Sequence, residues 1–331
     1  MTFPVAGHRQ GKDLILATVP FASELPGRSW LAVSSTLVLL VLAWVGALML
    51  PNLGMKLLAG VLLGLLALRM FVIYHDHQHH SILPNSPLAG ALMTVFGVWA
   101  LSPPSIWRSS HNHHHNHNSQ LLGSHIGSFP IMTADGYRKS SRYARVRYLA
   151  MRHPLTLLFG YVSIFLMGMC LGPFVRQPRR HSDCLISFLV HVAMGVGLHA
   201  YGGWTAVLCV QTLPSFLLYG VGSYLFYAQH NFPDVKFRSR GGWTYELAAL
   251  ESSSFLRMSA WMNWFTANIG YHHVHHLNSK IPFYRLPEAM RGIPELQNPR
   301  TTTFHPRDIL ACLRLKVWDT TAEVMTGCPR S

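Results

Sequence analysis

The sequence predicts an all-α integral membrane protein with four transmembrane helices, further re-entrant or interfacial helices, and a cytosolic helical cap. Three observations support this fold class. Only 12% of the 331 residues are charged, against roughly 25% in soluble domains. Several apolar runs reach the length of about 20 residues that a bilayer-spanning helix needs. Histidines gather in four clusters that lie close to these apolar runs.

The predicted spans come in two pairs whose connections carry no charge. The link at 51–54 reads PNLG and the link at 201–204 reads YGGW, so both are expected to be tight turns on the outer side of the membrane. A shorter apolar run at 88–101 is expected to be interfacial or re-entrant. The four predicted spans are 30–50, 55–74, 184–201 and 204–227.

Basic segments predict which side of the membrane each connection faces. Arg and Lys are frequent in 138–152, 175–183 and 236–240, and the positive-inside rule places all three in the cytoplasm. The apolar run 155–174 lies between two of them, so a re-entrant or membrane-surface pair of helices fits it better than a full crossing. The competing interpretation is that 155–174 spans the membrane.

We expect one domain over residues 1–331, with a core of about 20–295 and a cytosolic C-terminal tail at 296–331. Residues 1–29 are polar and mixed, so no cleavable signal peptide is expected. The five cysteines show no CxxC pairing, which argues against a zinc ribbon or a disulfide framework. The formal charge of +14 more often reflects topology and anionic lipid in an apolar chain, and no nucleic-acid partner is expected.

The histidine clusters follow helical spacing. In YHDHQHH, after the second predicted span, His75 and His79 are four residues apart and share one helix face, while His77 points away. His80 could bind a second metal or support a ligand. The segments HNHHH and HHVHH both show an i, i+3, i+4 pattern, and YAQHNFP contributes a single histidine at the end of the last span. These segments select His111, His114 and His115, then His272, His275 and His276, and finally His230.

The number of selected histidines favours a site with two metals. Imidazole suits iron, zinc, copper and nickel. A structural zinc ion needs only four ligands, whereas these spacings supply eight to ten. That number fits two five- or six-coordinate metals and points to di-iron. The Glu-x-x-His pattern of soluble di-iron bundles is absent, so we expect an all-nitrogen site at the mouths of the membrane helices.

At this point the sequence resembles a known family. HDHQHH, WRSSHNHHH, YAQHNFP and NIGYHHVHHLNSKIPFYRLPEAM are similar to segments of the membrane fatty acid desaturases, most closely the bacterial and plastid-type acyl-lipid desaturases. The resemblance covers roughly 20–295 and implies four membrane helices that carry a cytosolic cap with two iron ions. Matched by motif, the iron ligands are His75, His79, His111, His114, His115, His230, His272, His275 and His276, with His80 as a further candidate.

Other residues near these clusters have two possible roles each. Asp76 could hydrogen-bond a ligand imidazole and fix its tautomer, or be a solvated carboxylate at a helix end. Asn268 could support a ligand in the same way or cap a helix. His113, His117 and His273 fall outside the ligand spacing and are expected not to bind metal.

The resemblance implies a membrane-bound fatty acyl desaturase. Such an enzyme uses O2 and the two irons to remove two hydrogens from an acyl chain, forming a cis double bond. The close alternatives are an acyl hydroxylase or a carotenoid ketolase on the same di-iron scaffold. A histidine-rich metal transporter is a distant alternative, because the predicted spans contain no Asp or Glu that would form a permeation path.

The partners follow from this chemistry. The expected substrate is a fatty acyl group linked to lipid, coenzyme A or a carrier protein. Residues 1–29 and 296–331 are too short for a haem or flavin domain, so we expect a separate electron donor of ferredoxin type, whose acidity would suit the basic cytosolic face. The chain is expected in the bacterial inner membrane, among membrane lipids, with the active site and both termini cytoplasmic.

Overall fold

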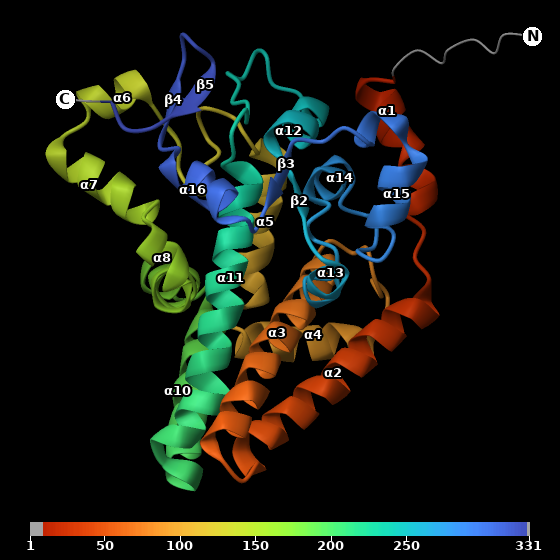
Figure 1. Cartoon of the computed structure of the whole chain (residues 1–331), viewed down its shortest axis with the longest axis vertical. Helices are drawn as coiled ribbons and strands as arrows, with labels where there is room; N and C mark the ends of the chain where they lie inside the picture. The colour runs from red at the N-terminus through yellow and green to blue at the C-terminus, as the bar shows by residue number, and fades with distance from the viewer. Residues whose placement is uncertain (1–8, 330–331) are drawn as a thin grey trace, which may run out of the picture.

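Long apolar helices form the lower part of the molecule, and short helices and strands cover their upper ends (Figure 1). The computed structural model describes residues 9–329. The lower part contains α2 (Pro26–Met49), α3 (Leu53–Gln78), α4 (Pro87–Trp99), α8 (Pro154–Leu158), η2 (Tyr161–Leu171), α9 (Gly172–Arg176), α10 (Ser182–Ala206), η3 (Val207–Thr212) and α11 (Leu213–His230). The upper part contains α1 (Gly11–Ala17), η1 (Val19–Phe21), α5 (Pro104–His117), α6 (Ala134–Lys139), α7 (Arg142–Met151), α12 (Tyr245–Ser252), α13 (Ala260–Phe265), α14 (His272–Leu277), α15 (Leu286–Gly292), η4 (Pro294–Leu296) and α16 (Pro306–Arg314), with strands β1 (Met132–Thr133), β2 (Phe255–Arg257), β3 (Thr301–Thr303), β4 (Val317–Asp319) and β5 (Val324–Thr326).

Three helical stretches of the described chain are long and apolar enough to cross a membrane: Pro26–Met49, Leu53–Gln78 and Ser182–His230. The first two are α2 and α3, which correspond to the predicted spans 30–50 and 55–74. They pack against each other. Their uncharged link ends at Asn52, whose side chain accepts the backbone N–H of Met55 at 2.9 Å and so caps α3.

The third stretch is two helical arms rather than one rod. At 49 residues a straight helix would be about 74 Å long, more than twice the roughly 30 Å thickness of the hydrocarbon layer. The helix breaks at Gly202 and Gly203, where Gly203 has φ +62°. The chain then turns back, so that the Gln211 side chain of the second arm donates to the carbonyl of His191 in the first at 2.9 Å. The two arms match the predicted spans 184–201 and 204–227.

The apolar segment α8–η2–α9 lies across these arms. Figure 1 shows it nearly end-on, while α10 and α11 run within the plane of the view. It packs on both arms, with Tyr161 stacked on Tyr219 at 5.6 Å and the Cys184 thiol donating to the carbonyl of Met169 at 3.4 Å. This orientation agrees with the predicted re-entrant or surface arrangement of 155–174.

The other short apolar helix is α4, whose 13 residues reach only about 20 Å. It is followed by α5 at an angle of 92°, and α5 is polar. This agrees with the interfacial or re-entrant helix predicted at 88–101. If α4 and α5 together were one broken span, they would make a fourth candidate.

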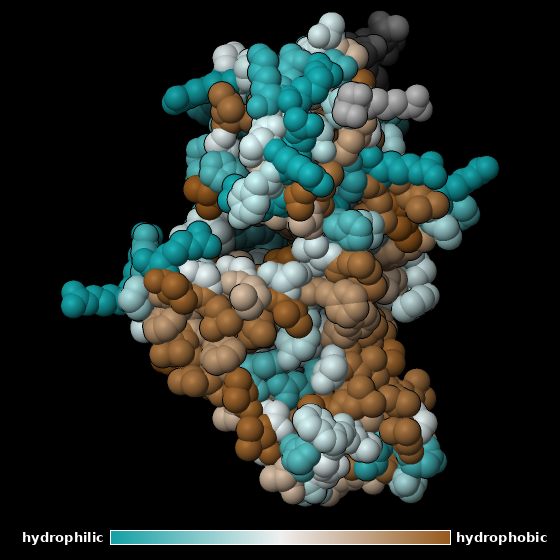
Figure 2. Space-filling view, turned by 90° about the vertical axis from the view of Figure 1, so that its left-hand side faces the viewer, coloured by the Kyte–Doolittle hydropathy of each residue, from teal (hydrophilic) through white to brown (hydrophobic). Residues whose placement is uncertain are grey.

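The surface divides in the same way as the ribbon. On the face in Figure 2, hydrophilic residues cover the upper part and hydrophobic residues most of the lower part. Large apolar side chains of α2 are also exposed, for example Leu31 at 67% and Val41 at 60%. Apolar surface of this extent is expected to face lipid, so the chain is a membrane protein.

The chain after residue 295 packs onto the upper part. Strand β3 runs parallel to β2, pairing Thr301 with Phe255, and β4 runs parallel to β1, pairing Val317 with Met132. Strand β5 completes the three-stranded sheet. The predicted C-terminal tail therefore contributes to the cap around the histidines.

Candidate metal centre

Nine of the ten histidines predicted as ligands lie in two adjoining groups. The five-histidine group consists of His75, His79, His111, His115 and His275. The four-histidine group consists of His114, His230, His272 and His276. Within each group, one ring nitrogen per residue lies within 4.8 Å of all the others.

Helical spacing distributes the side chains between the two groups. Helix α3 and its C-cap supply His75 and His79, whose ring centroids are 4.6 Å apart. Neighbouring residues of α5, His114 and His115, belong to different groups because successive side chains point about 100° apart around a helix. Helix α14 repeats this with His275 and His276.

The two groups share a boundary. The rings of His115 and His276 stack at 4.2 Å across it. Helix α11 contributes His230, its last residue, to the centre of the four-histidine group. Its Nε2 lies 3.0 Å from Nε2 of His114 and 2.9 Å from Nε2 of His272.

These spacings fit metal coordination. Two nitrogens bound at right angles to one metal, each about 2.1 Å from it, are about 3.0 Å apart. The Nε2 atoms of the pairs His114–His230 and His272–His230 match this separation. In the five-histidine group, Nε2 of His115 lies 3.2 Å from Nε2 of both His111 and His275. The donor set is made entirely of imidazoles, which suits iron and its neighbours.

Burial lowers the pKa of most of these rings and leaves some nitrogens without a protein partner. Desolvation first, and neighbouring imidazoles second, hold the pKa of seven rings well below the ordinary value for histidine. Nε2 of His79 and of His276 are buried and have no hydrogen-bond partner in the described chain. Buried polar atoms of this kind normally have partners, and a bound metal ion would supply one. The seven rings whose pKa is held well below the ordinary value are those of His79, His111, His114, His115, His272, His275 and His276.

Polar atoms behind the rings fix three of them. Nδ1 of His75 lies 3.2 Å from the carboxylate of Asp76, which also accepts the backbone N–H of Phe283 at 2.7 Å. Nδ1 of His230 lies 3.0 Å from the carbonyl oxygen of Ser252. Nδ1 of His114 contacts the hydroxyl of Ser128. Contacts of this type set the tautomer and orientation of a metal-binding imidazole.

Helix α5 is itself held in place from α10. Asp183 accepts the backbone N–H of Ser105 at 3.0 Å and its hydroxyl at 2.6 Å, which satisfies a free N–H at the start of α5. His181 lies 2.9 Å from the same hydroxyl. His181 and Asp183, with Cys184, form a further cluster of metal-binding residue types. The contacts of His181 and Asp183 are explained by their role in capping α5.

The structure does not bring His80 to either group. His80 is exposed, and its backbone has φ +57° because α3 has already ended. His113 and His117 also lie outside, and their rings stack on each other at 3.9 Å. His273 points away from both groups, and its Nε2 lies 3.2 Å from the carbonyl oxygen of Leu296.

Asp76 and Asn268, for which the sequence left two roles open, differ in whether they contact a histidine of the site. Asp76 contacts a candidate ligand directly, as described above. Asn268 does not contact a histidine of either group through any hydrogen bond in the described chain. Its side chain donates to the carbonyl of Phe283 at 3.1 Å, and its backbone has φ +57° in the turn before α14.

Two contacts were not foreseen from the sequence. Ser128 reaches His114 from a loop 14 residues further on, and no spacing rule connects them. Trp107 stacks on the His111 ring at 4.9 Å with an interplanar angle of 16°. The i, i+4 spacing of Trp107 and His111 was available as a signal for this second contact.

Comparison with known proteins decides the family. The profile of the fatty acid desaturase family matches residues 52–307, which includes all nine grouped histidines. The chain belongs to the fatty acid desaturase family. It is therefore a membrane fatty acyl desaturase, an oxidoreductase.

Curated relatives of this desaturase are similar over most of the chain. A fatty acid desaturase of Bacillus subtilis (strain 168) is 33% identical over 256 residues, covering 76% of this chain and 71% of the relative. An sn-1 oleoyl-lipid 12-desaturase of Picosynechococcus sp. is 24% identical over 228 residues, covering 68% and 65%. A Delta(12)-fatty-acid desaturase of Arabidopsis thaliana is 24% identical over 241 residues, covering 68% and 62%.

Proposed function

We propose that the two histidine groups each hold one iron ion and together form the desaturating centre. The observation that carries this proposal is the division of nine buried imidazoles into adjoining groups of five and four. The Nε2 spacings of about 3 Å within each group support it, as does membership of the family. His80 is left out of the proposed ligand set because it lies outside both groups.

The proposed reaction converts two adjacent methylenes of an acyl chain into a cis double bond. The two hydrogens removed, together with two electrons from a donor and two protons from the solvent, reduce O2 to two molecules of water. When bound, the irons supply an O2-dependent oxidising power that amino-acid side chains lack. The chain itself contributes neutral imidazoles, fixed ring orientations and a buried setting that excludes water.

Aromatic side chains beside both groups support the exclusion of water. Trp107 stacks on His111, and Phe71 packs edge-on against Trp107 at 5.0 Å. On the other group, the Phe226 ring lies 4.9 Å from the ring of His114. An apolar wall of this kind also suits an acyl chain.

The proposed substrate is an acyl chain of a membrane lipid. Relatives named as oleoyl-lipid desaturases support this choice over an acyl group carried by coenzyme A or a carrier protein. The acyl chain would reach the site from the side of the long apolar helices, because α3 and α11 carry His75 and His230 at the ends nearest the cap.

We also propose a separate acidic electron donor of ferredoxin type. Helices α6 and α7 carry Arg138, Lys139, Arg142 and Arg147 at the surface of the cap, and positive charge favours an acidic partner. If the donor docks electrostatically, raising the salt concentration should slow electron delivery without changing turnover driven by a small chemical reductant. Equal salt dependence in both assays would count against this docking.

The proposed topology has four crossings, formed by α2, α3 and the two arms around Gly203. The histidines, the basic segments and both termini would then be cytoplasmic, in a bacterial inner membrane. Residues 1–8 lie outside the described part of the chain, so the N-terminal side is argued from residue 9 onward.

The activity is tested by expression in a host that makes only simple fatty acids. Mass spectrometry should find and locate a new double bond in the host lipids. The matched control is His275→Ala, which should leave the lipids unchanged. A hydroxylated acyl chain, or a carotenoid that has gained a keto group, in place of the double bond would overturn the proposal.

A further inference from the structure

Arg152 is a fully buried cation beside the four-histidine group, at 0% exposure. Within residues 9–329 no carboxylate lies within ion-pairing distance of its guanidinium. Such a charge is costly to bury without a counter-ion, so its partners have to compensate. Its hydrogen bonds go to the carbonyl oxygen of Pro130 at 2.9 Å, the side-chain oxygen of Asn231 at 2.5 Å and, more weakly, the carbonyl oxygen of Leu315 at 3.5 Å. The rings of Tyr227 and Tyr148 lie 5.1 Å and 5.7 Å from the guanidinium carbon, and Nε has no hydrogen-bond partner in the described chain.

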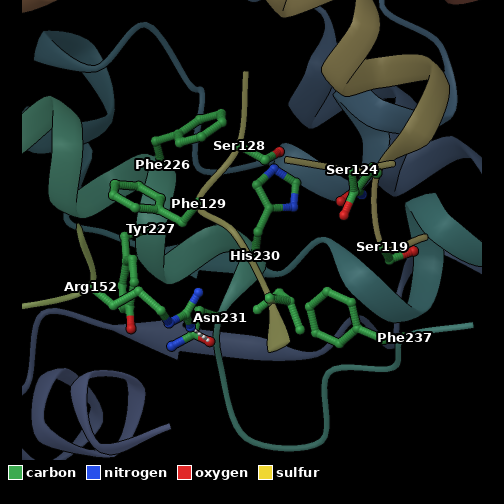
Figure 3. Close-up of a pocket in the computed structure, with 12 residues that line it drawn as sticks. Ser119, Ser124, Ser128, Phe129, Arg152, Phe226, Tyr227, His230, Asn231 and Phe237 are labelled. Carbon is green, nitrogen blue, oxygen red and sulfur yellow. Dashed lines mark hydrogen bonds between the residues drawn. The ribbon is translucent and has the colours of Figure 1, made fainter. Parts of the chain in front are cut away.

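These three partners come from three separate segments that meet at the end of α11. Pro130 follows the loop that carries Ser128, Leu315 follows α16, and Asn231 is the residue after His230. Figure 3 shows Arg152 and Asn231 joined by a hydrogen bond on one side of a cavity that His230 and Ser128 also line. The guanidinium therefore ties together the surroundings of His230.

Asn231 carries the connection onward to the C-terminal segment. Its amide donates to the carbonyl of Cys312 at 2.7 Å and to that of Leu315 at 3.4 Å. The Lys316 ammonium in turn donates to the carbonyl of Arg152 at 2.8 Å, and the Tyr148 hydroxyl donates to the carbonyl of Lys316. Residues 312–316 lie beyond the part matched by the family profile, which ends at 307.

His230 is the last residue of α11, and Asn231 has left the helix, with φ −138° and ψ 81°. The backbone before His230 is held by the N–H of Ser254, which donates to the carbonyl of Gln229 at 3.0 Å, and the backbone after it is held through Asn231. The ring of His230 is fixed by Ser252, and the backbone beside it is fixed through Asn231. Metal–ligand distances in proteins normally stay within about 0.2 Å of their usual values.

We propose that Arg152 and the end of α16 are a positioning device that sets His230 and so supports metal binding at the four-histidine group selectively. This inference rests on the proposed function, since it assumes that both groups bind iron. Arg152 contacts neither substrate nor metal and acts only through Asn231 and the surrounding carbonyls. The fork of Arg reaches several acceptors at once, which a Lys ammonium on a flexible stem does not reproduce.

The test is an anaerobic Fe(II) titration of metal-free, folded protein, in wild type and in Arg152→Met. Wild type should bind two irons per chain. Arg152→Met should keep one of them at wild-type affinity and bind the other roughly 10–100-fold more weakly, the size usual for losing an outer contact of a metal ligand. Arg145→Met on α7 is the matched control and should match wild type. That guanidinium donates to the carbonyls of Ser140 and Arg138 and lies over the Tyr137 ring, and none of these residues belongs to either histidine group.

Two results would overturn the positioning role. The first is that the Arg152→Met protein binds both irons as tightly as wild type, even if its unfolding temperature falls. The other is an equal loss at both groups, which would mean a general packing role. If Arg152→Met does not accumulate folded, Asn231→Ala takes the same test, because it removes the link without removing the charge. Wild type that binds no iron would overturn the proposed function instead.

Discussion

His114 and His115 are neighbours in sequence, yet they face different groups of the site. The cause is the helical rotation between successive side chains, and His275 and His276 repeat it on α14. The same rotation turns His113 and His117 away from the site, where they stack on each other. At the residue scale, a histidine-rich stretch therefore divides by its phase on the helix.

This division predicts opposite results for neighbouring substitutions. His114→Ala should abolish the new double bond in host lipids, because it removes a nitrogen from the four-histidine group. His113→Ala and His117→Ala should keep activity within about twofold, as surface substitutions away from special features usually change free energies by about 0.5 kcal/mol. Lipid analysis of the three strains is the measurement, and an inactive His113→Ala would contradict the phase argument.

Substitutions of Asp76 should lower iron affinity by different amounts. Its carboxylate contacts His75 and also accepts the N–H of Phe283. Asp76→Ala should therefore lower iron affinity or activity by roughly 10–100-fold without abolishing it. Asp76→Asn keeps one oxygen acceptor and should lose less. Iron titration of both variants checks this order, and a full loss in Asp76→Asn would make Asp76 a direct ligand.

Short elements carry most of the histidines, and loops hold these elements in place. The loop after α5 folds back over that helix and brings Ser128 to His114. It can do so because Gly127 has φ +70° and leaves no room for a side chain. A Cβ there would lie 2.1 Å from the carbonyl oxygen of Ser110 and 3.3 Å from Cβ of His114.

A pair of glycine substitutions separates this close approach from backbone strain. Gly123→Ala, at φ +100° with no atom within 4 Å of the new Cβ, should cost only the strain of a left-handed residue, about 1–2 kcal/mol. Gly127→Ala adds the clash and should displace Ser128, lowering activity as well as the unfolding temperature. Equal activity in the two variants would show that the loop does not support His114.

The spacing of residues within a helix was readable from the sequence, whereas contacts between distant loops were not. The i, i+3, i+4 patterns predicted which histidines of α5 and α14 face the site. Nothing local to Ser128, Arg152 or Phe283 indicated that they would reach it, because those contacts depend on how loops cross in three dimensions. The candidate ligand His80 was wrong for a related reason: the sequence did not show that α3 ends before that residue.

At the scale of the whole molecule, paired apolar helices bring distant histidines to one end. The α2–α3 pair and the two arms around Gly203 each return the chain to the cap. Composition and charge-free turns predicted these pairs from the sequence. The basic flanks of 155–174 favoured a re-entrant or surface position over a crossing, and η2 lies across the long helices in the structure (Figure 1).

The topology predicts where reporters will be found. Reporter fusions after residues 153 and 180 should both be cytoplasmic, because α8, η2 and α9 lie across the spans. A fusion at Gly203 should be on the outer side. Opposite locations for the fusions at 153 and 180 would mean that this segment crosses the membrane, and would place α14 and α5 on different faces.

The most direct test of the account is the amount of iron bound by the purified chain after anaerobic reconstitution with Fe(II). Nine imidazoles in adjoining groups of five and four predict two irons per chain, and loss of iron in His275→Ala and in His272→Ala. Binding of no iron, or of one iron that neither substitution affects, would contradict the claim that these histidines form the di-iron centre.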